Sequence, residues 1–318
     1  MMYRPHAFRA GAALLTIAIA TTACSPRDQE SSQPPEAMSS TSCDRACLSG
    51  LLTDYLAALE AGDVSGLRLA DEVRFTEDQQ TRTLGVEGIW ASDVELMSYR
   101  LDMIDVREGV AASLVKVREN GVPVLMALRL LTAEGRISGV ESMVVRTEEE
   151  GMIYAVDAVQ TPSEAMTHAP PPAQRNTREE MIEIASRYPR GLQVGSFVTS
   201  DVPFAPDAYR FENGQLMAGP GCTFLPGCEH IKTQRIPTLS GLVYRVAAVD
   251  EEQGIVLLRM DFGPGSVFER PGRPQGQSVS VFEAFKVYGG QVHAVEAFME
   301  LKPAEQSLGW EFAETSVG

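Results

Sequence analysis

Histidine and basic residues are scarce in this chain, which has four histidines in 318 residues. The 27 Lys and Arg are outnumbered by 43 Asp and Glu, which gives a formal net charge of −16. A general nucleic-acid binder needs a basic surface to displace counterions from phosphates, so we expect no nucleic-acid partner. The sequence also lacks a GxSxG elbow, an HExxH zinc motif and a Walker phosphate loop, and we expect neither a metal nor a cofactor. What is present, 44% hydrophobic and 22% charged residues, suits a globular chain with room for two domains.

The N-terminus predicts a signal peptide over residues 1–24. Arg4 and Arg9 form a positive start, and the apolar and small-residue stretch that follows is too short for a membrane helix, which needs about 20 residues. This stretch ends at Cys24 and resembles a bacterial lipobox, in which the cysteine becomes lipid-modified. Thr21 stands where a lipobox usually has a bulky aliphatic residue, and ordinary signal-peptidase cleavage nearby is the alternative.

Residues 25–42 contain mainly Ser, Pro and acidic residues and have little to bury. This composition predicts a disordered tether between the lipid and the first folded unit. We therefore expect a periplasmic protein that is anchored to the outer membrane through its N-terminal lipid.

The remaining four cysteines are Cys43, Cys47, Cys222 and Cys228. An even count in an exported chain favours two disulfides, for which three connectivities exist. The local pairing of Cys43 with Cys47 and of Cys222 with Cys228 is the simplest. A zinc site is the weaker alternative, because the spacings are not CxxC and no histidine pair completes a tetrahedral set.

The sequence contains an internal repeat. Val73–Asp78 (VRFTED) resembles Tyr209–Gly214 (YRFENG), and Gly135–Glu141 (GRISGVE) resembles Gly290–Glu296 (GQVHAVE). The two pairs are offset by 136 and 155 residues, so the second half carries an insertion of about 20 residues. The candidate positions for this insertion are 217–240, which contains a cysteine pair, and 263–278.

Each half begins with a helical pattern and continues with strand-like segments. Leucines recur at helical spacing over 48–59, and a capping box of Thr177 and Glu180 precedes the second helix. One helix followed by an antiparallel sheet must pack on one sheet face, which predicts an α+β fold. The strand-like segments are 94–106, 110–118, 122–131 and 136–146, then 242–249, 255–262, 279–288 and 291–301. The predicted divisions beyond the tether are a first domain over 43–165, a Pro-rich linker over 166–176, a second domain over 177–305 and a tail over 306–318.

Three motifs carry a family resemblance: Tyr55–Asp63 (YLAALEAGD), Arg74–Glu77 (RFTE) and the terminal Gly-x-Ile/Val-x-x-Val-Glu strand. With them the chain resembles the nuclear transport factor 2-like superfamily, and within it the SnoaL-like proteins, in tandem over about residues 43–301. It is also similar to an uncharacterised two-part family of bacteria and fungi, which has Glu-Asn-Gly (Glu212–Gly214) in its second part. The resemblance implies two cones, each open between its helix and a curved antiparallel sheet. It also implies a range of activities that includes isomerases, dehydratases, cyclases, lyases and non-catalytic binding modules.

Strand alternation singles out one carboxylate in each half. Under period two, Glu141 shares a face with Ile137, Met143 and Val145, and Glu296 shares one with Val292, Ala294 and Phe298. Desolvation on such a face raises a carboxyl pKa and favours a general acid or base. The alternative is that each glutamate pairs with a buried arginine and serves the architecture. The candidate arginines are Arg74, Arg129, Arg210 and Arg259.

Further candidates lie near the repeat motifs and in the insertion. Glu77 and Glu212 form a matched pair, each close after an arginine, and His230 follows Cys228 in the insertion. His168, in the Pro-rich linker, and His293, opposite Glu296, are more typical of solvated or structural positions.

Two functions follow. The first is a cofactor-independent lyase, isomerase or dehydratase acting on a small hydrophobic or aromatic molecule. In it, Glu296 or Glu212 moves a proton and Arg210, Tyr209 or His230 stabilises an oxyanion, with Glu141 near the ligand. The second is a non-catalytic envelope module that binds a ligand or a protein partner. The expected partners are the small molecule, the membrane through the lipid alone and, as one option, a second copy in a homodimer.

Overall fold

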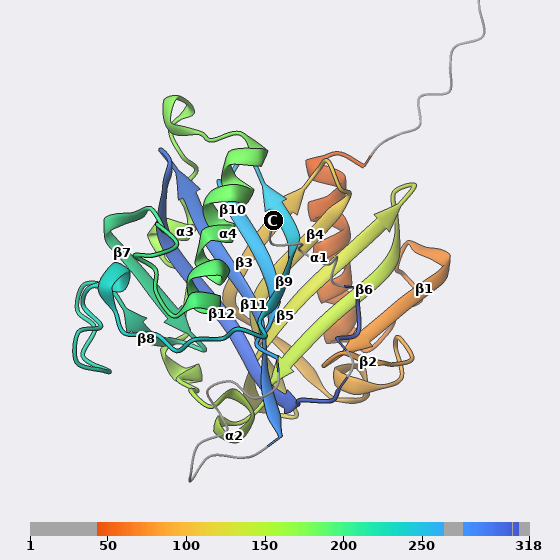
Figure 1. The fold of residues 1–318 in the computed structure, drawn as a ribbon. Helices are drawn as coiled ribbons and strands as arrows, with labels where there is room; N and C mark the ends of the chain where they lie inside the picture. Colours follow the sequence, from red (N-terminus) through yellow and green to blue (C-terminus); the bar gives the residue numbers. More distant parts are fainter. Residues whose placement is uncertain (1–42, 264–275, 307, 312–318) are drawn as a thin grey trace, which may run out of the picture. The chain divides into compact units, whose positions relative to one another are not determined.

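The computed structural model describes residues 43–263, 276–306 and 308–311 (Figure 1). The predicted signal peptide, the tether and Cys24 lie outside these residues. Within the described part, no helix combines the length and apolarity that a membrane crossing requires.

The first half consists of one helix followed by a six-stranded sheet. The helix α1 (Arg45–Ala61) begins at Asp44, whose side chain accepts a hydrogen bond from the Cys47 amide, and ends at Gly62 in the left-handed conformation. The sheet has the strand order β2-β1-β6-β5-β4-β3, in which β1 and β6 are parallel and the other pairs antiparallel. The elements are β1 (Leu69–Glu77), β2 (Gln80–Thr81), the 3-10 helix η1 (Gly88–Ala91), β3 (Val94–Asp105), β4 (Val110–Glu119), β5 (Val122–Ala133) and β6 (Arg136–Val145).

The second half repeats this arrangement. The predicted capping box is present at the start of α4 (Arg178–Val194), and the sheet order is β8-β7-β12-β11-β10-β9. The predicted α+β fold, with one helix ahead of each sheet, is therefore confirmed. The strands are β7 (Phe204–Glu212), β8 (Gln215–Ala218), β9 (Val243–Asp250), β10 (Ile255–Asp261), β11 (Gln277–Tyr288) and β12 (Gln291–Pro303). The short helices are α2 (Glu148–Gly151), η2 (Val156–Ala158), α3 (Glu164–Thr167) and η3 (Pro172–Gln174) between the halves, and η4 (Ile231–Thr233) between β8 and β9.

Strand register aligns the two halves residue by residue. Glu141 pairs with Thr76 across β6 and β1, and Glu296 pairs with Phe211 across β12 and β7, so Thr76 corresponds to Phe211. The next turn confirms this register: Asp78 (φ 50°) and Asn213 (φ 43°) both accept a hydrogen bond from a backbone amide of the last strand, at 2.8 and 2.9 Å.

The offset at this motif is therefore 135 residues. With this offset Glu77 corresponds to Glu212, as expected. The two Arg-Phe motifs, Arg74-Phe75 and Arg210-Phe211, are however out of register by one residue. The counterpart of Arg210 is Phe75 and not Arg74.

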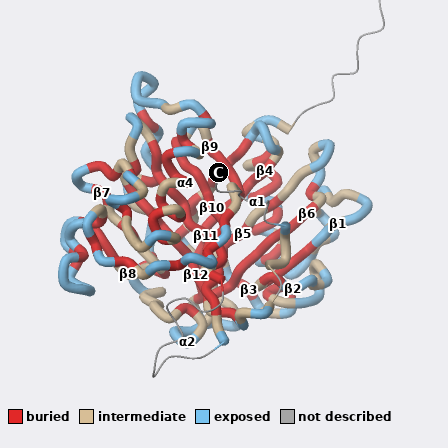
Figure 2. Tube along the Cα trace, viewed as in Figure 1, coloured by how far each residue is buried: buried red, intermediate tan, exposed pale blue. Residues whose placement is uncertain are grey.

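The two sheets share a buried core. Side chains from both halves, including Met103 and Leu114 of the first and Phe282 and Phe298 of the second, form one buried cluster. Figure 2 shows that buried residues follow the strands of both sheets. The halves therefore bury apolar surface against each other as well as under their own helices.

Two ion pairs join the halves reciprocally. Arg45, the first residue of α1, makes a double hydrogen bond at 2.9 Å to Asp250 at the end of β9. Arg178, the first residue of α4, makes the matching contacts at 2.8 and 2.7 Å to Asp105 at the end of β3. Asp250 also accepts a hydrogen bond from the Ile104 amide of the first half. Asp105 accepts one from the Val249 amide of the second half. The contact is thus of the self-complementary kind found in twofold dimers.

A buried lysine holds the segment between the halves. Lys286 of β11 donates hydrogen bonds to the carbonyls of Met166, His168 and Gln253, at 3.3, 2.5 and 2.6 Å. Pro170 of the predicted linker is buried and packs near Gly254. The Pro-rich segment therefore lies against the second half.

Candidate functional site

The space between α1 and its sheet is filled by side chains. Trp90 of η1 donates a hydrogen bond to the Tyr55 hydroxyl at 3.0 Å, and Phe75 and Leu128 are buried beside the same core. Glu77 accepts the Ile89 amide at 2.9 Å and pairs with Arg146 at 2.8 Å, which fixes η1 in place. Glu77 therefore has a structural role.

The second half instead encloses a cavity of about 530 Å³ beside α4. Its walls are mainly apolar, with Leu192, Ile236, Leu239, Val281 and Met299 among them. An apolar cavity with a small number of polar groups is the usual form of a small-molecule site.

A polar cluster projects into this cavity from three elements. Arg210 and Glu212 lie two residues apart on β7, so their side chains share a face, and the Arg210 Nε lies 2.8 Å from the Glu212 Oε1. Arg210 also donates from Nη1 to the hydroxyl of Tyr188 on α4 at 3.0 Å. Glu283 of β11 completes the cluster and is only 3% exposed.

Burial has a strong effect on the carboxyl group of Glu283. Burial raises the pKa of Glu283 to about 8, the charge of Glu212 adds to the rise, and Arg210 and Tyr188 oppose it. Glu283 therefore holds a proton at neutral pH, whereas Glu212 is the ion-paired carboxylate. Burial also raises the pKa of Tyr188 well above its usual value, so its hydroxyl stays neutral.

The first half shows that the fold does not require these charges. The helix caps align Tyr55 with Tyr188, and the register of β5 and β11 aligns Leu128 with Glu283. Arg210 and Glu283 therefore occupy positions where the first half has Phe75 and Leu128. Two ionisable side chains at positions that the same architecture fills with apolar side chains call for an explanation other than folding.

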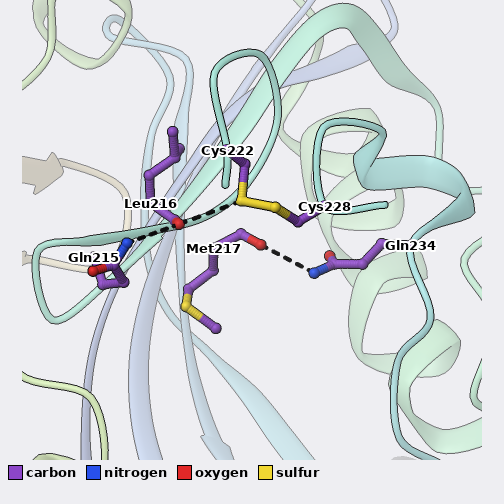
Figure 3. The surroundings of a disulfide bond; sticks show 6 residues. All are labelled: Gln215, Leu216, Met217, Cys222, Cys228 and Gln234. Carbon is purple, nitrogen blue, oxygen red and sulfur yellow. Dashed lines mark hydrogen bonds between the residues drawn. A yellow bond between two sulfur atoms is a disulfide. The ribbon is translucent and has the colours of Figure 1, made fainter. Parts of the chain in front are cut away.

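The insertion forms one side of the cavity. Both predicted disulfides, Cys43–Cys47 and Cys222–Cys228, are confirmed. Figure 3 shows the second one beside the Leu216 carbonyl, with Gln234 donating a hydrogen bond to the Met217 carbonyl at 3.0 Å. Of the two candidate insertions, 217–240 contributes cavity residues, and most of 263–278 lies outside the described residues.

Glu296 does not point into the second cone, and this prediction was wrong. It faces the core between the sheets, where it accepts a hydrogen bond from the Tyr99 hydroxyl at 2.7 Å. The physical reason is a register shift between Val292 and Ala294, which breaks the period of two: Val292 lies in the core under α4, while Ala294 and Phe298 lie between the sheets.

Glu141 pairs with buried arginines, which was the structural alternative to a role as acid or base. It lies between the sheets, 3.5 Å from Arg129, 3.4 Å from Arg259 and 2.5 Å from Arg245. Arg129 and Arg259 are thus confirmed as partners of this carboxylate. The two other candidate arginines pair elsewhere: Arg210 with Glu212, while Arg74 donates to the Gly309 carbonyl and stacks on Trp310.

Two further predicted site residues lie away from the cavity. Tyr209 projects from the opposite face of β7 to Arg210 and shares a hydrogen bond with Ser163. His230 is exposed at the start of η4 and does not line the cavity. The candidates that the structure brings together are thus Arg210 and Glu212.

Glu283 and Tyr188 complete the cluster but were not predicted. Glu283 had a usable signal, because it is the one acidic residue in the strand 277–288 and lies between apolar neighbours, Phe282 and Ala284. In the part of the chain that the structure describes, no group of three or more His, Cys, Asp or Glu side chains is arranged to hold a metal ion.

Each half has a helix ahead of a six-stranded sheet, the arrangement that the resemblance implied. The chain is similar in part to the following solved structures. A Kribbella flavida protein provisionally named a ketosteroid isomerase is 19% identical (TM-score 0.27) over 32% of this chain and 80% of its own. A de novo designed protein with a curved β-sheet is 17% identical (TM-score 0.27), over 32% and 88%. An NTF2-like protein of unknown function from Cytophaga hutchinsonii is 12% identical (TM-score 0.26), over 31% and 89%. These likenesses concern the fold and say nothing of activity.

The family comparison covers the half with the cavity. Residues 174–299 match the model of a domain of unknown function, DUF8021. No functionally curated protein matches the chain.

Proposed function

We propose that the second half is a cofactor-independent acid–base enzyme of the lyase, isomerase or dehydratase type, acting on a small hydrophobic or aromatic molecule. The observation that carries this proposal is the replacement of Phe75 and Leu128 of the filled first cone by Arg210 and Glu283 in the open second cone. The resemblance to SnoaL-like proteins agrees with this class of chemistry, and the polar cluster itself carries the proposal.

The two carboxyl groups have complementary roles in this mechanism. Glu212, the ion-paired carboxylate, accepts a proton from the substrate, and Glu283, which is protonated at neutral pH, donates one to a substrate oxygen. Arg210 stabilises negative charge that develops on that oxygen, and Tyr188 holds the guanidinium in position. Removal of a proton at one atom and delivery at another suffices for an isomerisation or for the elimination of water.

The test combines ligand discovery with variants of the cluster. Aromatic and hydroxylated small molecules that raise the melting temperature are incubated with the protein, and conversion is followed by mass spectrometry. We expect turnover to fall about 10²- to 10⁴-fold in Glu283→Gln, the usual scale for one general acid–base group. The double variant Arg210→Phe/Glu283→Leu copies the first half and should lose ligand stabilisation as well.

Glu296→Gln is the matched control, because Glu296 is a buried glutamate on the other face of the same sheet. It should keep ligand stabilisation and turnover. Ligands that stabilise wild type without conversion would favour the non-catalytic binding module. Stabilisation that survives in Arg210→Phe/Glu283→Leu would place the ligand outside this cavity.

We also propose that the protein is exported and carries a lipid on Cys24. The two disulfides support an oxidising compartment, where such bonds persist. Cells given a palmitate analogue should label the wild type and not Cys24→Ser. Equal labelling of both would refute the anchor.

A further inference from the structure

Two large apolar side chains stand at the edge of the cavity. Phe224 and Leu225 both line it, yet they are 44% and 48% exposed. Among the exposed large hydrophobic residues of the described ranges, these two alone border the cavity, and all the others are valines. Their position beside an apolar cavity makes the exposed surface of these two side chains continuous with the cavity wall.

The loop that carries them is fixed at both ends. The Cys222–Cys228 disulfide closes it, Cys228 is buried, and the Gly219 amide donates to the Cys228 carbonyl at 2.7 Å. The Cys228 amide donates to the Leu225 carbonyl at 3.1 Å. Such bonds hold the two apolar side chains at the edge before any ligand arrives, which lowers the entropy cost of binding.

The first half has no counterpart of this loop. There, β2 ends at Thr81, η1 begins at Gly88, and Trp90 of η1 fills the cone. In the second half, the chain between β8 and η4 contains the disulfide loop in this region. The half that contains the insertion is thus also the half whose helix and sheet enclose a cavity.

Burial varies along the cavity. The polar cluster is deeply buried, with Glu283 at 3% and Arg210 at 5% exposure, whereas the disulfide loop is about half exposed. The exposed Arg235 also borders the cavity and keeps its charge in solvent. The Arg210 cluster thus offers buried polar groups to a ligand, whereas Phe224 and Leu225 offer apolar contacts where the cavity meets solvent.

We infer that Phe224 and Leu225 bind the outer part of an elongated ligand, a molecule with one polar group at the Arg210 cluster and an aliphatic or aryl tail that leaves the cavity between them. This inference rests on the proposed function, since it assumes that the cavity binds a ligand. It adds the shape of that ligand and assigns two residues that determine its length.

The test uses 4-n-alkylphenols with chains of two to eight carbons, each below its critical micelle concentration, with binding measured by calorimetry. For wild type, Kd should fall with each added methylene through the longest chains, by at most about three- to fourfold, the value for a fully buried methylene. Phe224→Ser/Leu225→Ser should bind ethylphenol as wild type does and octylphenol at least tenfold more weakly. The control Val122→Ser removes another exposed apolar side chain, 56% exposed and in the first half, and should match wild type throughout.

Disulfide removal gives a second, independent measurement. Cys222→Ser/Cys228→Ser should weaken octylphenol binding selectively, because the loop is no longer held at the edge. The same dependence on chain length in wild type and in Phe224→Ser/Leu225→Ser would overturn the inference while leaving the cavity a ligand site. Failure of every alkylphenol to bind wild type would instead count against the proposed function, and with it this inference.

Discussion

Glu283→Gln is expected to be more stable than the wild type at pH 9 and nearly equal to it at pH 5. Burial raises the pKa of Glu283 from 4.5 to about 8, so between these values the folded protein binds a proton that the unfolded chain has lost. Its contribution to stability is complete below pH 4.5 and is lost as the pH rises through about 8. The difference at pH 9 is on the order of 5 kcal/mol, because the shift is about 3.5 pKa units and each unit corresponds to about 1.4 kcal/mol.

Denaturant unfolding at pH 5, 7 and 9 measures this effect. Asp78 and Glu300, whose pKa values burial also raises, weaken wild type and variant alike as the pH increases, so the comparison isolates Glu283. Glu149→Gln, an exposed position, serves as the control and should follow wild type. Parallel curves for Glu283→Gln and wild type would mean that Glu283 is ionised throughout, and the proposed proton donor would be lost.

Asp105→Ala should destabilise the protein by about 3–5 kcal/mol, the usual cost of removing one partner from a buried ion pair. Asp105 is buried. Its carboxylate accepts hydrogen bonds from both Nη atoms of Arg178 and from the Val249 amide. Its loss leaves a largely buried guanidinium without its main partner and removes a bond between the halves. Asp250→Ala should behave in the same way through Arg45.

Equilibrium unfolding with fluorescence and circular dichroism measures this loss. Glu95→Ala breaks the exposed Arg118–Glu95 pair at 2.9 Å, and this should cost less than about 1 kcal/mol. A loss of that size in Asp105→Ala would show that the reciprocal pairs contribute little to the contact between the sheets.

Local patterns explain why the fold could be predicted. The leucine spacing of the first helix, the Thr177 capping box and the β-branched segments each fix an element through interactions within a few residues. Repetition of the whole series indicated two similar units. The reciprocal pairing of Asp105 and Asp250 was not visible, because each aspartate contacts an arginine 73 or 205 residues away.

The site could be predicted only in part, and the reason is geometric. Arg210 and Glu212 were found because they belong to a repeated motif at the end of a strand. Glu296 was misplaced because a single register shift exchanges the two faces of a strand, and nothing in the local sequence marks the shift at Val292. Glu283 was missed because no repeated motif contains it.

The reciprocal contact between the halves also determines how their association depends on protein concentration. Two separate subunits held by such a contact come apart on dilution, since their association depends on concentration. Here both partners lie on one chain, so the contact forms at an effective concentration set by the segment between them, and dilution does not disrupt it. The second half alone has the large cavity beside α4, and the first half packs against it and stabilises it. Even at low abundance, the two halves and the cavity beside α4 would thus stay assembled.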